Sequence, residues 1–373
     1  MDVLTRDDAL HCVKIFQDYF KNFTRIDEYM KDQKLNSLSE LPTTLPGFGP
    51  EDDIFSDFTM HPKDMEFEIL EIPSVSWETM VNITSSHVNI PPVGRNIKLA
   101  IREKNTSKYV GFIRIGSPVI NCKPRNIMLN QVFTQDEQRA KRFNNSSMMG
   151  FVIVPTQPFG YNYLGGKLLA AICCSHTVRK MVNKKYDMNL CLFETTSLYG
   201  SSKTVSQYDG MKPFIRYKGL TDSDFIPMMH GKPFVDLRKF VESKVGKIVD
   251  DGVSSRKLKI TLRIISLIKS ALKVNKDDLE LSKFMKVIND AKILTEQKRY
   301  YVSHYGFKNY IQYVNNETDT LIKDETYDKF ELENVISWWK NKATNRYDTI
   351  KSENRLRSEL ELWTGDKDID IIR

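Results

Sequence analysis

The chain has 373 residues, of which 40% are hydrophobic, 11% aromatic and 28% charged, and its formal net charge is +7. This composition provides enough apolar side chains for a sizeable core, and it excludes a wholly disordered chain, a collagen-like repeat and a small disulfide scaffold. Because the sequence contains no run of about 20 apolar residues, it predicts neither a membrane-spanning helix nor a membrane partner.

The first part of the chain, residues 1–90, is predicted to be an acidic N-terminal extension. One or two helices are expected over residues 3–33, because four apolar residues recur at helical spacing: Ala9, Val13, Phe16 and Phe20. Thr5 and Asp8 have the spacing of a capping box at the start of the first helix. Further on, residues 65–70 alternate apolar and acidic side chains, which predicts a short strand.

The middle of the chain, residues 91–231, has the pattern of a compact α/β domain. Residues 96–102 and 109–115 alternate apolar and polar side chains and predict the two strands of a hairpin. Residues 150–155 and 189–196 are apolar runs suited to buried strands. A loop with glycines and a helix over about residues 165–183 lie between these two runs, which predicts a β-α-β unit.

The last part of the chain, residues 232–373, is predicted to be mainly helical. Arg256–Val274 places its apolar side chains on one face and several cations away from that face. Such a helix can dock on its own core with a solvated face, or it can lie on nucleic acid or a membrane. Trp338 and Trp339 can stack on bases or pack in the core. The expected fold is therefore α/β with α+β character: a mixed central sheet with flanking helices and a helical C-terminal region.

Charge is distributed unevenly over these three segments. Residues 1–90 carry a net charge of −10, residues 91–231 carry +12 and residues 232–373 carry +5. Two basic segments favour a polyanionic partner such as nucleic acid. The alternative is that the acidic extension packs against the basic middle segment and neutralises it.

The cysteines and histidines form no recognisable metal motif. The five cysteines include no C-x-x-C pair, and the six histidines are scattered. We therefore expect no bound metal, and we interpret the adjacent Cys173 and Cys174 as buried thiols. The acidic N-terminus has no features of a secretory signal, so a reduced, cytoplasmic protein is expected.

The loop after residues 150–155 is a candidate phosphate site. Residues 152–169 read VIVPTQPFGYNYLGGKLL, and two glycines open the helix that follows. Unpaired backbone N–H groups and the helix dipole favour an anion at such a helix start. Lys167 is followed by Leu168, so the loop is not a P-loop. The alternative is that the glycines only allow tight packing of the helix against the strand.

This loop resembles the pyrophosphate-binding stretch of the GNAT acyltransferase superfamily, in which a strand runs into Q/R-x-x-G-x-G/A at a helix start. The loop here is longer than usual, since Gln157 lies eight residues before Gly165. The preceding hairpin also resembles the hairpin of that superfamily. The resemblance implies a GNAT-like sheet and an acyl-coenzyme A or similar donor, with five residues as candidate donor contacts: Gln157, Gly160, Gly165, Gly166 and Lys167.

A second resemblance covers residues 109–221. The stretches PFGYNYLGGKLLAAICCS, KKYDMNLCLFETTSLYGSS and IRYKGLT, in this order, resemble the Druantia-type DruA family, which is found in phage defence and near mobile elements. The same order of strand, glycine-opened helix, strand and tyrosine-containing loop is similar to the phage Mom DNA-modification proteins, which are GNAT-like. These resemblances imply a phage-encoded or bacterial protein and a role in DNA modification.

Hydroxyl and carboxylate side chains lie at the end of the second strand of the β-α-β unit, where open α/β sheets bind ligands. Tyr199 or Tyr208 is a candidate general acid towards a leaving thiolate. Glu194 is a candidate base for an attacking amine, or it pairs with Lys184 or Lys185. Three serines are candidate substrate contacts: Ser197, Ser201 and Ser202.

Four basic residues between the hairpin and the central strand are candidate contacts to nucleic-acid phosphates: Arg125, Arg139, Lys141 and Arg142. The alternative is a solvated basic loop. The leading functional hypothesis is acyl transfer onto a nucleic-acid base or another amine. The competing hypothesis is a non-catalytic nucleic-acid-binding or assembly protein on the same fold.

Overall fold

The computed structural model describes residues 3–38, 50–86, 88, 94–133, 136–197, 206–221, 228–250, 256–294 and 298–363. The chain forms two compact units, one of residues 1–41 and 223–296 and the other of residues 42–222 and 297–373. These units do not coincide with the three charge segments, which meet at residues 90 and 231. The physical reason is that the first helices of the chain pack with helices that follow residue 231, and so join segments far apart in sequence.

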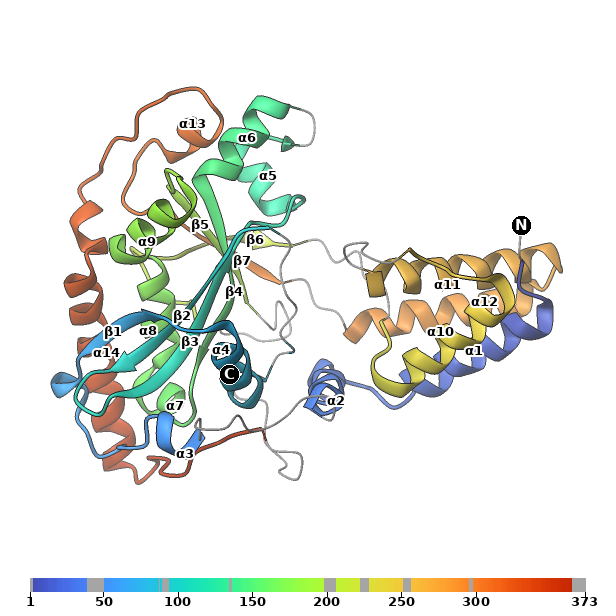
Figure 1. The fold of residues 1–373 in the computed structure, drawn as a ribbon, viewed down its shortest axis with the longest axis horizontal. Coiled ribbons are helices and arrows are strands. Elements are labelled where there is room, and N and C mark those ends of the chain that lie inside the picture. Colours follow the sequence, from blue (N-terminus) through green and yellow to red (C-terminus); the bar gives the residue numbers. More distant parts are fainter. Residues whose placement is uncertain are drawn as a thin grey trace. The chain divides into compact units, whose positions relative to one another are not determined.

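The smaller unit is a helical bundle (Figure 1) with the elements α1 (Arg6–Phe20), α2 (Ile26–Leu38), α10 (Gly231–Val245), α11 (Arg256–Val274), α12 (Asp278–Asp290) and η3 (Ala291–Leu294). Its core joins Phe16 of α1, Ile268 of α11 and Phe284 of α12. The predicted capping box of Thr5 and Asp8 is present at the start of α1. The helix predicted over Arg256–Val274 has the bounds of α11.

Lys34 of α2 is an unusual core residue, because its side chain is fully buried and its Nζ has no hydrogen-bond partner. Burial lowers the pKa of Lys34 to about 8, since a buried ammonium loses its hydration. We expect Lys34→Met to stabilise the smaller unit by about 1–3 kcal/mol at pH 7. The unfolded chain binds the lysine proton up to a higher pH than the folded chain does, so the gain should shrink as the pH rises from about 8 towards 10.5.

Urea unfolding followed by circular dichroism checks this prediction. All four tryptophans lie in the larger unit, so tryptophan fluorescence identifies the transition of that unit separately. A loss of stability in Lys34→Met at pH 7 would contradict the prediction, because it would mean that the ammonium makes a net favourable interaction.

The larger unit is built on a seven-stranded mixed sheet with the order β1-β2-β3-β4-β5-β7-β6 (Figure 1). The strands are β1 (Phe67–Glu71), β2 (Asn96–Glu103), β3 (Lys108–Gly116), β4 (Ser147–Pro155), β5 (Leu192–Thr196), β6 (Arg216–Leu220) and β7 (Arg299–Ser303). Neighbouring strands are antiparallel, except that β4 and β5 are parallel. The predicted α/β class with a mixed sheet is thus confirmed.

Helices cover both faces of this sheet. The helical elements of this unit are α3 (Pro50–Asp53), η1 (Pro62–Asp64), α4 (Ser74–Thr84), α5 (Lys123–Leu129), α6 (Glu137–Ser146), α7 (Phe159–Tyr163), α8 (Gly165–Cys173), α9 (His176–Tyr186), α13 (Tyr310–Val314), η4 (Tyr327–Phe330) and α14 (Leu332–Ser352). Leu99 of β2 packs in the core that contains α8. The next residue, Ala100, packs in a separate core with Trp77 of α4. This alternation is the period of two that the hairpin pattern predicted.

The structure corrects two sequence-based expectations. The helix expected over residues 165–183 is two helices, because the Ser175 side chain accepts the N–H of Val178 and starts α9. The C-terminal region also supplies a strand, β7, which pairs with β5 and β6.

Cys173 and Cys174 are buried free thiols, as expected. Within the described ranges, no helix combines the length and apolar character needed to cross a membrane.

The acidic N-terminal segment contributes ion pairs to the sheet of the larger unit. Arg102 of β2 pairs with Glu68 of β1 at 2.7 Å. Lys98 of β2 pairs with Glu78 of α4 at 2.5 Å. These pairs neutralise two cations of the basic middle segment, and the alternative, in which the acidic extension neutralises that segment as a whole, stays a prediction.

Candidate functional site

The two parallel strands at the centre of the sheet stop pairing after four residues. β4 and β5 pair from Ser147↔Leu192 to Gly150↔Thr195, whereas β3 pairs with β4 as far as Pro155. In the part of the chain that the structure describes, residues 152–155 therefore have a strand partner on one side only, and Phe151 lies at a bulge in the β3–β4 pairing. Backbone N–H and C=O groups along the other edge of β4 can hydrogen-bond an extended ligand.

The glycines after β4 differ in what surrounds them. A Cβ atom on Gly160 would meet the Gln157 side chain and Pro155, and a Cβ atom on Gly165 would lie 2.7 Å from the Phe159 ring and 2.8 Å from Pro155 Cβ. These two glycines allow close packing of the loop on the end of β4. Around Gly166, by contrast, the nearest atoms all belong to the side chain of Gln207, and Oε1 is the closest.

Two more residues predicted to contact the acyl donor, Gln157 and Lys167, form hydrogen bonds within the protein through their side chains. Gln157 is 6% exposed, and its Oε1 accepts the N–H of Tyr161 at 3.0 Å. Lys167 Nζ donates to the carbonyl oxygens of Gln207, at 3.0 Å, and Asp209. Burial lowers the pKa of Lys167. Lys167 thus ties the start of α8 to the turn around Asp209.

Asp209 connects this turn to β7. Its carboxylate accepts hydrogen bonds from Tyr301 OH at 3.0 Å and from Arg299 Nη1 at 3.2 Å. It also accepts the N–H of Ser206 at 2.9 Å. No local pattern in the sequence indicates this cluster, because about 90 residues separate Asp209 from its two side-chain partners and because β7 has no clear sequence signal.

The predicted hydroxyl groups near the end of β5 are only partly described. Tyr208 is 4% exposed, and its ring centroid lies 5.2 Å from that of Tyr301. Burial raises the pKa of Tyr208 to about 12, so its hydroxyl keeps its proton at neutral pH. Ser197 pairs with the backbone of Arg299: its N–H donates to the carbonyl at 2.9 Å, and its Oγ accepts the N–H at 3.2 Å. Three predicted site residues lie outside the described residues: Tyr199, Ser201 and Ser202.

Glu194 of β5 forms a buried ion pair. Its carboxylate accepts hydrogen bonds from Arg125 Nη1 at 3.1 Å and from Ser147 Oγ at 2.9 Å, and neither charged side chain has any exposed surface. Burial raises the pKa of Glu194, and the positive charge of Arg125 opposes this shift. The alternative partners considered for Glu194 were Lys184 and Lys185, but Lys185 pairs with Glu71.

The ion pair corrects the prediction for Arg125. Its guanidinium lies 4.5 Å from the centre of the Phe143 ring, and Nη2 donates to the carbonyl of Ile120 at 2.6 Å. Because Arg125 is fully buried, its guanidinium is not accessible to a phosphate at the surface. The prediction placed it on a basic loop, whereas α5 points it into the core.

The other three predicted phosphate contacts differ in their ion pairs and in the exposure of their side chains. Arg142 binds Asp319, donates to Asn316 Oδ1 at 3.0 Å and lies 4.8 Å from the Tyr313 ring centre. Lys141 is exposed. Arg139 is partly exposed and pairs with Asp136 at 3.3 Å. Lys141 and Arg139 are thus the more accessible of these cations.

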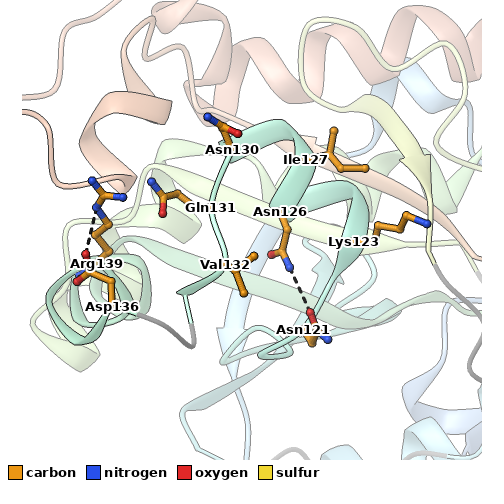
Figure 2. A pocket seen from close by; sticks show the side chains of 9 residues that line it. All are labelled: Asn121, Lys123, Asn126, Ile127, Asn130, Gln131, Val132, Asp136 and Arg139. Carbon is orange, nitrogen blue, oxygen red and sulfur yellow. Dashed lines mark hydrogen bonds and ion pairs between the residues drawn. The ribbon is translucent and has the colours of Figure 1, made fainter.

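Arg139 also lines an open depression of about 770 Å³ beside α5 and α6 (Figure 2). The lining contains Asn121, Lys123, Asn126, Ile127, Asn130, Gln131, Val132, Asp136 and Arg139. Asn126 Nδ2 donates to Asn121 Oδ1 at 3.1 Å, while the buried Asn126 Oδ1 has no partner. The carboxamides and cations of this lining suit a polar ligand.

Among the described residues, no group of three or more His, Cys, Asp or Glu could hold a metal ion.

The part of the chain that carries most of this site matches a known protein family. Residues 44–210, less than half of the chain, match the family model described as Druantia protein DruA. This segment is DruA-like. It contains β1 to β5, the glycine loop and the turn with Asp209, whereas β6, β7 and the helices of the smaller unit lie outside it. The match confirms the DruA resemblance for this segment and begins before residue 109, where the sequence resemblance starts. No curated protein and no solved structure matches the chain.

Proposed function

We propose that the larger unit is a GNAT-like enzyme that transfers an acyl group from a coenzyme A thioester onto an amine of nucleic acid. The observation that carries this proposal is the end of β4–β5 pairing at Gly150 and Thr195, on a β4 strand that leads into a glycine-opened helix. The order of strand, glycine loop, helix and strand resembles that of the GNAT superfamily. A half-paired β4 edge supplies hydrogen bonds for the amide groups of an extended donor arm.

The start of α8 is the proposed contact for the phosphates of the donor. Gly165, Gly166 and Lys167 form the first turn of this helix, where N–H groups and the helix dipole favour anions. The residues present fit such a group, because a carboxamide oxygen of Gln207 already lies in the space that a side chain on Gly166 would fill. An anionic oxygen can replace it when the flexible Gln207 side chain turns away.

The proposed reaction joins the amine nitrogen to the acyl carbonyl carbon and breaks the bond between that carbon and sulfur. The amine nitrogen releases one proton as the amide forms, and the leaving thiolate must receive one. Tyr208, which is protonated at neutral pH, is the described candidate donor to sulfur, and the proton released by the amine restores its hydroxyl. Most of the rate enhancement is assigned to holding donor and amine together and to polarising the carbonyl. The buried ion pair with Arg125 favours a structural role for Glu194 over the predicted role as a base.

The proposed acceptor is a nucleic-acid base, because residues 91–231 carry a net charge of +12 and the DruA-like segment also resembles phage Mom proteins. The proposed setting is DNA modification by a cytoplasmic, phage-encoded or bacterial defence-related protein.

One observation favours the competing function, a non-catalytic nucleic-acid-binding or assembly protein. Lys167 and Gln207 together cover the start of α8, and two glycines there have clear packing roles.

Substitution of Gly166 tests the proposed donor site. Gly166→Asp places a carboxylate in the first turn of α8, where it suits the helix dipole but repels phosphates. We expect the variant to fold and its affinity for coenzyme A to fall by at least about tenfold, or about 1.4 kcal/mol. Isothermal titration calorimetry on the full chain measures this affinity, and tryptophan fluorescence confirms folding.

Two variants serve as controls. Gln207→Ala clears the space over Gly166, so coenzyme A affinity should be kept or increased. Gly165→Ala brings a Cβ atom against Phe159 and Pro155, so its main effect should be on stability. Equal coenzyme A affinity in the wild type and Gly166→Asp would contradict the site. A wild type that binds nucleic acid but no coenzyme A would favour the non-catalytic function.

A further inference from the structure

One face of α11 in the smaller unit carries a row of cations and hydroxyl groups. The row consists of Lys259, Arg263, Ser266, Ser270 and Lys273, which we call the α11 basic face. All five side chains are exposed. They recur every three or four residues and therefore lie on one side of the helix. The helix contains no Asp or Glu residue.

Among the described residues, no acidic side chain pairs with the cations of this face. Two cations elsewhere in the smaller unit do have acidic partners: Arg6 pairs with Asp277 at 2.6 Å, and Lys244 pairs with Asp8 at 3.1 Å. Throughout the described ranges, no ion pair involves Lys259, Arg263 or Lys273. The face therefore presents three uncompensated positive charges to a partner.

The other face of α11 excludes insertion of this helix into a lipid bilayer. Ile260, Ile264, Ile268 and Leu272 are buried in the core of the bundle. An amphipathic helix that binds a membrane must place its apolar face in the lipid. Because α11 already uses that face for folding, only the basic face is available, and it suits a polyanion in water.

We propose that the α11 basic face binds the phosphate backbone of double-stranded DNA. This inference rests on the proposed function, in which nucleic acid is the partner. It specifies that the nucleic acid is a DNA duplex and that the α11 basic face is the surface that binds it. From Lys259 to Lys273 the helix rises about 21 Å, at about 1.5 Å per residue. An α-helix fits the major groove of B-DNA, where cations on one face reach phosphates and serine hydroxyls donate hydrogen bonds to phosphate oxygens.

The composition of the face favours a DNA duplex over other nucleic acids. Single-strand binding relies on aromatic side chains that stack on bases, and the α11 basic face has none. The major groove of double-stranded RNA is too deep and narrow for such a helix. The contacts available are to the backbone, so the binding is expected to depend weakly on DNA sequence and strongly on salt.

The test compares two triple variants of the full chain. In the first, Lys259, Arg263 and Lys273 are all replaced by alanine. In the matched control, Lys14→Ala, Lys232→Ala and Lys239→Ala remove three exposed charges from α1 and α10 of the same unit. Fluorescence anisotropy of a labelled DNA duplex of random sequence gives Kd at several salt concentrations between about 50 and 200 mM.

We expect the first variant to raise Kd by about tenfold or more and to lower the slope of log Kd against log salt by about three, one for each lost contact. The control should change Kd by less than about threefold, and coenzyme A affinity should be unchanged in both variants. Equal weakening in both variants, or an unchanged Kd in the first, would overturn the proposal.

Two further outcomes are informative. If a single-stranded oligonucleotide binds as tightly as the duplex and loses affinity equally in the first variant, the assignment to duplex DNA is overturned. If the wild type binds no nucleic acid at all, the acceptor class of the proposed function fails together with this inference. If the wild type binds duplex DNA through other residues, only this inference fails.

Discussion

Replacing Arg125 with methionine is expected to destabilise the larger unit by about 3–5 kcal/mol, because it leaves the buried carboxylate of Glu194 without its positive partner. Arg125 Nη1 lies 3.1 Å from Glu194 Oε2, and both side chains are fully buried. Urea unfolding followed by tryptophan fluorescence measures the loss, since all four tryptophans belong to this unit.

Two variants give this prediction its controls. Arg139→Met breaks an exposed pair with Asp136 and should cost no more than about 1 kcal/mol. The double variant Arg125→Met with Glu194→Leu removes both charges and should recover much of the lost stability. If Arg125→Met costs less than about 1 kcal/mol, Glu194 does not depend on this pair, and its predicted role as a base regains support.

Trp339→Ala is expected to destabilise the larger unit by about 3–5 kcal/mol, as is typical for loss of a large buried aromatic side chain. The Trp339 side chain is fully buried, and its Nε1–H donates to the carbonyl of Tyr163 at 2.9 Å. Its ring centroid lies 5.1 Å from that of Phe67 and 6.3 Å from that of Phe159. Trp339 thus links α14 to α7 of the glycine loop and packs in the core, so base stacking is not available to it.

Trp338→Ala is the matched variant for this experiment. Trp338 is only partly buried and contacts Phe214, with ring centroids 5.0 Å apart. It should cost roughly half as much free energy of unfolding as Trp339→Ala or less. Urea unfolding measured through the three remaining tryptophans compares the two variants. A larger loss in Trp338→Ala would contradict the packing described for α14.

Local patterns predicted much of the sheet and of the helices. The hairpin of β2 and β3, the central strand β4 and the bounds of α11 follow from periods of two and 3.6 residues. The break at Ser175 also had a local signal, because serine is a preferred N-cap residue. It was missed because the apolar pattern of α8 continues into the next helix.

Contacts between distant residues could not be predicted from one sequence. Arg125 and Glu194 are 69 residues apart, and nothing near Arg125 marks it as an interior cation. β7 is only five residues long and lies between helical segments, so its pairing with β5 depends on tertiary structure. For the same reason the sequence gives no sign that residues 1–41 and 223–296 form one unit.

The same difference between local sequence patterns and contacts of distant residues applies to the candidate site. The glycines and Lys167 were identified from the loop sequence, and the structure brings Gly166 and Lys167 together with Gln207. The contacts of Asp209 with Arg299 and Tyr301 could not be found, because they join a turn to a strand far along the chain. Periodicity locates secondary structure, whereas the environment of each polar group depends on the packed fold.

The proposed function requires that a coenzyme A thioester binds along the half-paired edge of β4. Hydrogen–deuterium exchange of the full chain, with and without saturating coenzyme A, tests it most directly. We predict slower exchange at the amides of residues 151–154 that face this open edge and at Gly165 and Gly166, because those N–H groups gain hydrogen-bond partners. Unchanged exchange at both places in the presence of saturating coenzyme A would contradict this binding site.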